Sequence, residues 1–239
     1  MAAYVQSAQS GINFGNTSWS LAFGSNNTPG NLLVCAVLAH VNAASPTLYL
    51  PTDTAGGGSG NQWYQAVTLA DIAPTFTDVG AIGIFYTYGC IGGANTVTAT
   101  WSAGGYSEIW IAEYSGLRVS NPLDVAESNY ADSTHNPGFP TTVTLPGLAQ
   151  GDLIVALSGS YNGQSTAGSG YTLRSVTDGT AAIYIDSNGS VPAGSTVVTT
   201  GPTDANSFAI VSAAFLLPSA QQPGPPGGPK TLVAAGTGW

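Results

Sequence analysis

Charged side chains are scarce in this chain of 239 residues. Asp, Glu, Lys and Arg together make up 6% of it, whereas ordinary domains contain about 25%. Arg118, Arg174 and Lys230 are the only basic residues besides two histidines, and the formal net charge is −9. So few cations cannot neutralise a phosphate backbone, and the negative charge repels one. The composition excludes a nucleic-acid partner and predicts a surface of uncharged polar residues.

Cysteines and long apolar runs are scarce as well. Cys35 and Cys90 are too few for a disulfide framework. Both lie in or beside apolar strand sequences, so we expect two small buried hydrophobic side chains, and the sequence leaves open whether they pair. No run approaches the ~18 apolar residues of a membrane span, and residues 1–6 lack the features of a signal peptide. We therefore expect neither a membrane partner nor a secretory leader.

Catalytic and metal-binding motifs are missing too. His40 ends an apolar run, which indicates a structural histidine, and His135 lies in a polar loop without the spacing of a metal-binding loop. Residues 163–167 fall one residue short of a nucleophile elbow and lie in a Gly-Ser loop. The only lysine, Lys230, lies near the C-terminus, so no phosphate-binding loop exists. We expect no cofactor and no metal site.

The carboxylates do not form an obvious glycosidase pair, which requires two carboxylates flanking the scissile bond. Glu108 and Glu113 lie in one predicted strand but differ in parity, so they should point to opposite faces. Asp186 and Glu127 could approach only through the fold, and nothing in the sequence brings them together. The sequence therefore predicts a protein that is not an enzyme.

A repeated strand pattern is what the sequence does contain. Residues 81–101 and 181–200 share Ala, Gly, Thr, Val and Thr at the same places when the second copy is shifted by one hundred. Each copy is rich in β-branched residues around a Gly-containing connection, which predicts a hairpin of two strands. Three further segments recur in the same order: 28–36 with 149–157, 63–69 with 170–174, and 107–117 with 207–217. The order predicts an internal duplication.

No convincing amphipathic helix is visible, and many short strands with regular turn signals predict sandwiches or barrels. Seven or eight strands per half fit a jelly roll or an immunoglobulin-like sandwich, and the missing cysteine–tryptophan–cysteine pattern favours jelly rolls. We predict an all-β fold of two tandem, internally duplicated, jelly-roll-like antiparallel β-sandwiches with an extended Pro/Gly C-terminal arm. The predicted boundaries are 1–117, 118–218 and 219–239. Whether the halves form separate sandwiches or share one is left open.

Two groups of residues are candidates for binding. Residues 221–229 form a Pro-Gly linker, and beyond it Leu232, Val233 and Trp239 make an apolar tip that could dock on another subunit or on its own domain. The aromatic residues at strand starts or loops could form a platform for neutral glycans, with core packing as the alternative. The candidates for this platform are Trp63, Tyr64, Tyr161 and Tyr171.

Residues 28–34, 112–117, 121–124 and 168–173 resemble a repeated β-module of structural proteins in tailed bacteriophages and of some secreted bacterial surface proteins. The resemblance covers about residues 4–217 and carries no catalytic residue. It implies a non-enzymatic virion protein, a capsid decoration or tail subunit assembled in the host cytoplasm. The implied partners are the major capsid protein, other virion subunits or further copies of the chain. The alternative is a glycan-binding adhesin or receptor-binding module at the cell surface.

Overall fold

A computed structural model describes residues 1–41, 46–72, 79–130, 142–149, 151–160, 167–176, 182–187, 191, 193–199 and 207–218. These residues form antiparallel strands, apart from turns and a four-residue helix, α1 (Ala55–Gly58). The predicted all-β class is confirmed. No helix among the described residues is long and apolar enough to cross a membrane.

The first half of the chain forms two sheets. The strands of the first large sheet lie in the order β1 (Ala3–Gln9), β9 (Tyr106–Ser115), β4 (Leu32–Val41), β7 (Val79–Thr87) and β6 (Tyr64–Ile72), with β2 (Asn13–Phe14) also paired to β9. The first small sheet has the order β3 (Ser18–Ala22), β8 (Thr96–Thr100) and β5 (Thr52–Asp53). Consecutive strands mostly alternate between the sheets, as in a jelly roll, except that β6 has joined the large sheet.

The second half has the same strand order. Its large sheet runs β10 (Leu123–Tyr130), β16 (Ser207–Phe215), β12 (Leu153–Ser160), β14 (Ala182–Ser187) and β13 (Tyr171–Val176). Its small sheet pairs β11 (Thr142–Leu148) with β15 (Gly194–Thr199). The large sheets also bulge at matching places, at Val5 and Asp124 in their first strands. We call two residues equivalent when they occupy the same place in the two large sheets. The duplication that this order would reflect stays a prediction.

The repeated segment is not the hairpin that the sequence predicted. The strands β7 and β8 do form, but β7 pairs with β4 and β6, whereas β8 pairs with β3 and β5 in the other sheet. The strands β14 and β15 are divided between two sheets in the same way. Strand composition and a glycine-containing turn are common to a hairpin and to a connection that crosses between sheets. The pairing partners, which lie far away in the sequence, decide between the two.

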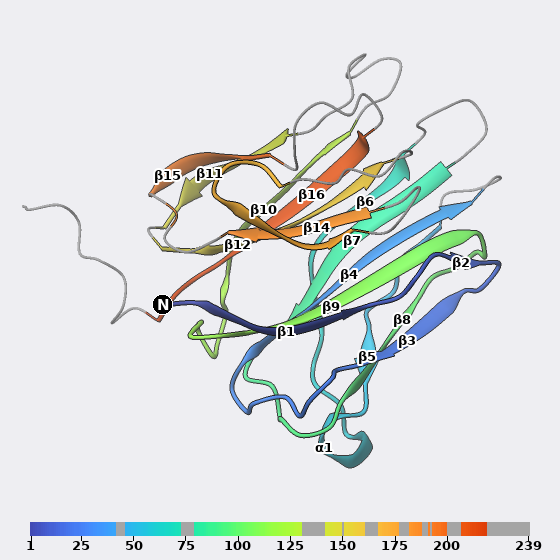
Figure 1. The fold of residues 1–239 in the computed structure, drawn as a ribbon, viewed down its shortest axis with the longest axis horizontal. Coiled ribbons are helices and arrows are strands. Elements are labelled where there is room, and N and C mark those ends of the chain that lie inside the picture. The colour runs from blue at the N-terminus through green and yellow to red at the C-terminus, as the bar shows by residue number, and fades with distance from the viewer. Residues whose placement is uncertain are drawn as a thin grey trace, which may run out of the picture.

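The four sheets stack as four layers, small, large, large and small (Figure 1). One apolar core lies between each small sheet and its large sheet, and a third core lies between the two large sheets. Strand β4 shows the alternation: Leu33 and Cys35 face the first small sheet, while Leu32 and Val34 face the second large sheet. Its unbroken apolar run predicted a strand covered on both sides, and this is confirmed. The two sandwiches therefore share a central core.

The central core is narrower at one edge than at the other. Cα atoms of β10 and β16 come within 8 Å of Cα atoms in β6 and β7. At this narrow edge Tyr86 packs edge-on against Phe215, with ring centroids 5.3 Å apart. The opposite edge is formed by β1 and β13, and larger side chains fill it, including Trp110 stacked on Tyr184 at 4.9 Å. The two edges of the central core thus differ in the distance between the large sheets and in the size of the side chains that lie between them.

Candidate functional site

A groove of about 350 Å³ opens at the wide edge of the central core. It lies between β1, an edge strand of the first large sheet, and β13, an edge strand of the second large sheet. Residues from β1, β9 and β13 line it: Ser7, Ala8, Gln9, Trp110, Arg174 and Ser175. Two of its polar atoms, Trp110 Nε1 and Ser175 Oγ, are buried without a hydrogen-bond partner. We call this the β1–β13 groove. Its lining is mostly polar, although it sits at the margin of an apolar core.

A charged cluster holds the two halves together beside this groove. Arg174 Nε donates a hydrogen bond to Asp186 Oδ2 at 2.7 Å, and Tyr114 Oη donates to the same oxygen at 2.9 Å. The Arg174 guanidinium also lies 4.0 Å from the centre of the Tyr4 ring. Burial raises the pKa of Asp186 more than its two partners lower it. The cluster links two residues of the first half to two of the second.

Glu113 is a buried carboxylate at the end of the first sandwich. It accepts hydrogen bonds from Gln6 Nε2 at 2.6 Å, Asn27 Nδ2 at 2.8 Å, the Thr28 backbone N–H at 2.8 Å and Asn31 Nδ2 at 2.7 Å. Burial raises the pKa of Glu113, but these hydrogen bonds outweigh burial and the pKa is lowered. The carboxylate thus ties the 25–31 turn to β1 and β9 and is not free for acid–base chemistry.

Asp152 is a buried carboxylate of the second half, and it faces another carboxylate. The Ala149 backbone N–H donates to Asp152 Oδ2 at 3.1 Å and to Asp124 Oδ2 at 3.0 Å. Burial first, and then the hydrogen bond and charge of Asp124, raise the pKa of Asp152 to about 7. Asp152 therefore keeps its proton over much of the acidic range.

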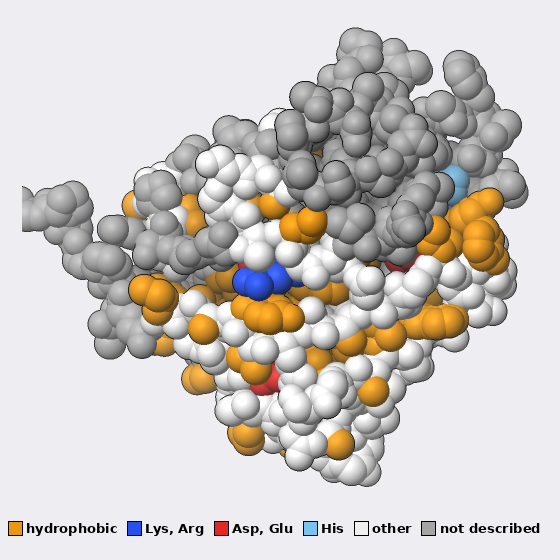
Figure 2. Space-filling model, viewed as in Figure 1, with side chains coloured by type: hydrophobic (Ala, Val, Ile, Leu, Met, Phe, Trp, Pro, Cys, Tyr) orange, Lys and Arg blue, Asp and Glu red, His pale blue; other side chains and the backbone are white. Residues whose placement is uncertain are grey.

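Two pairs of neighbouring aromatic side chains reach the surface. Tyr64 is 37% exposed, and its ring stacks on Tyr88 at 5.1 Å with a 9° interplanar angle. At the end of the first large sheet, Phe14 and Tyr106 are 63% and 45% exposed, with ring centroids 4.6 Å apart. We call Phe14 and Tyr106 the end patch. Figure 2 shows hydrophobic atoms beside a histidine at one end of a face that carries few charges. The ring centroids of His40 and Tyr106 are 6.1 Å apart.

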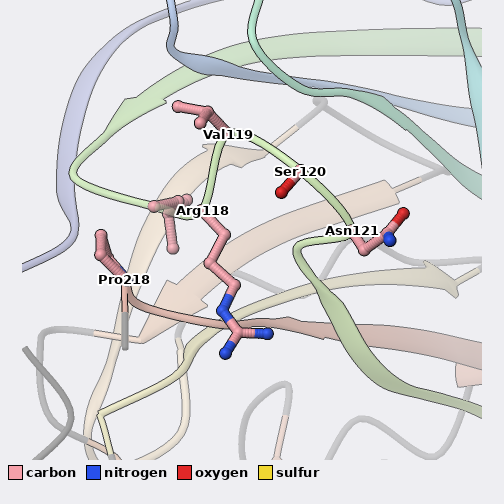
Figure 3. A pocket seen from close by; sticks show the side chains of 6 residues that line it. Arg118, Val119, Ser120, Asn121 and Pro218 are labelled. Carbon is pink, nitrogen blue, oxygen red and sulfur yellow. The ribbon is translucent and has the colours of Figure 1, made fainter. Parts of the chain in front are cut away.

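A second cavity, of about 430 Å³, lies where the chain crosses from the first sandwich to the second (Figure 3). The Arg118 backbone N–H donates to Leu216 O at 3.0 Å and the Leu216 N–H donates to Pro122 O at 2.7 Å, which anchors the crossing. Figure 3 shows Arg118, Val119, Ser120, Asn121 and Pro218 around the cavity. Most of the residues that line this cavity belong to the exposed segment that connects β9 to β10. None of their side chains has a buried polar atom without a hydrogen-bond partner.

No known family model, curated protein or solved structure matches this chain.

The predicted glycan platform is not assembled as one surface. Trp63 is buried in the core between the first two sheets, where its Nε1 donates to Asp53 Oδ2 at 2.9 Å. Tyr64 begins β6 and Tyr171 begins β13, at opposite edges of the stack. Burial raises the pKa of Tyr171 to about 12. Tyr161 lies outside the described residues.

Sequence reasoning missed Tyr88, which completes the exposed stack with Tyr64. The signal was present: Tyr86 and Tyr88 are two residues apart, so they share a face, and Tyr86 is the cross-strand partner of Tyr64. The groove residues were missed because they come from three strands whose neighbourhood depends on how the large sheets stack. The apolar tip with Leu232, Val233 and Trp239 lies outside the described residues.

The carboxylates and cysteines that the sequence singled out lie within the described residues. Glu108 and Glu113 point to opposite faces of β9, as predicted, since their neighbours of like parity belong to different cores. Asp186 and Glu127 are separated by two strands. Cys35 and Cys90 are buried and unpaired, and Cys90 Sγ donates to Thr28 O at 3.0 Å. Among the described residues, no three His, Cys, Asp or Glu side chains converge as metal ligands.

Proposed function

We propose that this protein is a non-enzymatic structural subunit of a tailed-phage virion, a capsid decoration or tail component. The shared central core is the observation that supports this best, because it joins two sandwiches into one continuous block through side chains of both large sheets. Such a block keeps surfaces on its two halves at a fixed separation, which a lattice subunit requires. The resemblance in sequence to phage structural modules points the same way.

The buried carboxylates favour a structural role over a catalytic one. Glu113, Asp186 and Asp53 each accept hydrogen bonds from side chains that hold strands or turns together. General acid–base catalysis needs such a group within reach of a substrate. These carboxylates contribute instead to the internal order of the block.

The end patch and the C-terminal tip are the proposed contacts with the major capsid protein, other virion subunits or further copies of the chain. Two adjacent exposed aromatic rings provide apolar area that a partner would bury. Multiplied over a symmetric lattice, contacts of modest affinity become strong by avidity. Assembly would take place in the host cytoplasm.

The test uses phage that carry a chain ending at Pro218, or the Phe14→Ser and Tyr106→Ser double variant. We expect folded proteins with lowered occupancy in purified particles, measured by quantitative mass spectrometry. Tyr49→Ser, which alters an exposed tyrosine elsewhere, should keep full occupancy. Full occupancy of both altered chains, or absence of the unaltered chain from particles, would contradict the proposal.

A glycan-binding adhesin is the second candidate, and the exposed Tyr64–Tyr88 stack favours it. Paired aromatic rings at a surface suit the apolar faces of sugars. Glycan-array binding that is lost in Tyr64→Ala and Tyr88→Ala, and kept in Tyr49→Ala, would support this role. An array without hits would remove it.

A further inference from the structure

Most residues that line the β1–β13 groove at the wide edge differ in polarity from their equivalents at the narrow edge of the central core. Four residues that line the β1–β13 groove have apolar equivalents at the narrow edge. By strand register, the equivalents of Ser7, Trp110, Arg174 and Ser175 are Ala126, Val211, Ala66 and Val67. All four apolar residues belong to, or pack against, the central core. The fold therefore does not require polar side chains at this place.

Two of the polar groups have no hydrogen-bond partner among the described residues. Trp110 is 0% exposed and Ser175 is 7% exposed, yet Trp110 Nε1 and Ser175 Oγ form no hydrogen bond. A buried polar group without a partner costs free energy, because it has lost its hydrogen bonds to water. At the narrow edge, valines at both equivalent positions avoid that cost. The unpartnered groups beside an open groove indicate that something outside the chain completes them.

We propose that the β1–β13 groove binds a neutral sugar residue. The groove offers hydrogen-bond donors from Trp110, Ser175 and Arg174, whose outer guanidinium nitrogens are not used by Asp186. Gln9 and Ser7 at the rim add groups that both donate and accept. A ligand rich in hydroxyl and ether oxygens matches this set, and about 350 Å³ lies at the lower end of small-molecule sites.

The electrostatics favour a neutral ligand over an acidic one. Asp186 compensates the Arg174 charge at 2.7 Å, and Asp186 Oδ1 is buried without a donor of its own. The chain also carries a net charge of −9, which repels anions. Arg174 is the charged residue that lines the groove, and because Asp186 offsets its charge, a carboxylate would gain little net attraction there. This proposal is independent of the virion role, because a structural subunit and an adhesin could each carry such a site.

The test is a titration of the full chain with glucose, galactose, mannose and N-acetylglucosamine, followed by two-dimensional NMR of the assigned Trp110 indole N–H. We expect at least one sugar to shift this resonance with a millimolar Kd, and glucuronate to bind more weakly than glucose. Ser175→Val should bind about 2- to 10-fold more weakly, the effect of one neutral hydrogen bond. The same variant should unfold at an equal or higher temperature, because no internal hydrogen bond is lost.

Ser128→Ala is the matched control, since Ser128 is the equivalent of Gln9 on β10 at the narrow edge. It should bind sugars as the unaltered chain does. The proposal is overturned if no sugar shifts the Trp110 resonance, which would leave water as the partner of these atoms. It is also overturned if Ser175→Val binds unchanged, or if glucuronate binds more tightly than glucose.

Discussion

The two halves of the molecule share a strand order but treat buried carboxylates in opposite ways. In the first half, Glu113 is surrounded by donors and stays ionised. Its equivalent in the second half is Ala214, and the carboxylate is found instead at Asp152, the equivalent of Asn31, opposite Asp124. One half therefore matches an acceptor with donors, while the other places two carboxyl groups together and raises the pKa of Asp152. The same scaffold tolerates both because backbone pairing, and not these side chains, defines the sheets.

Replacing Glu113 by alanine, which copies Ala214, tests the first half and should have the largest effect. The change leaves the Asn27 and Asn31 amides buried without their acceptor. We expect the free energy of unfolding in urea to fall by about 3–5 kcal/mol. Glu127→Ala, on the exposed side of β10, should change it by less than about 0.5 kcal/mol. A loss below about 1 kcal/mol for Glu113→Ala would show that the donors find other partners.

The second half should respond to pH in the opposite direction. Because the folded pKa of Asp152 is raised to about 7, the folded chain binds a proton that the unfolded chain lacks between about pH 4 and pH 7. Stability from this group is therefore lost as pH rises through that window, by at most about 4 kcal/mol. The lowered pKa of Glu113 acts the other way, and its contribution is lost as pH falls below its usual range.

Asp152→Asn separates these two contributions. Urea unfolding between pH 4 and pH 8 should lose most of its slope in this variant, while the decline in strong acid remains. Ser128→Ala, which alters no titratable group, should leave the whole profile unchanged. An equally steep slope in Asp152→Asn would assign the pH dependence to other groups.

The two edges of the central core provide the next comparison. Arg174→Ala copies Ala66 of the narrow edge and leaves Tyr114 as the hydrogen-bond partner of Asp186 within the described part of the chain. We expect a loss of about 2 kcal/mol at pH 7, since Arg174 is partly exposed and the pair is screened. Combining it with Asp186→Asn should restore part of that loss. If the two changes are additive in a double-mutant cycle, Arg174 and Asp186 do not stabilise each other across β13 and β14.

The smallest effect is expected at the rim of the narrow edge. Tyr88→Phe removes a hydrogen bond of 3.4 Å to the exposed Tyr64 but keeps the stacked rings. Thermal unfolding should shift by less than the equivalent of about 0.5 kcal/mol. A larger loss would mean that the hydroxyl pair, and not the ring contact, holds this surface.

Local sequence was informative where burial depends on one strand and uninformative where it depends on stacking. The apolar run of β4 predicted coverage on both faces, and the parity of Glu108 and Glu113 placed them correctly. The same sequence could not tell which sheet covers Leu32 and Val34, so the shared core was left open. Trp63 and Tyr64 illustrate the limit. The two residues are adjacent and both aromatic, but the Trp63 side chain is buried and the Tyr64 side chain is exposed.

The pairing of the first strand with β9 has a consequence for how the chain is made. Gln9 pairs with Trp110, and Tyr4 with Tyr114, so the first large sheet cannot close before about half of the protein has been synthesised. Its face with Leu32, Val34 and Ala36 then waits for the second large sheet, which needs roughly another hundred residues, or about 5–20 s at ribosomal speed. Such distant pairings also slow folding itself. During translation, a half-synthesised chain therefore exposes an apolar sheet face. The risk that this protein aggregates is greatest at that stage, when nascent chains on neighbouring ribosomes lie close together.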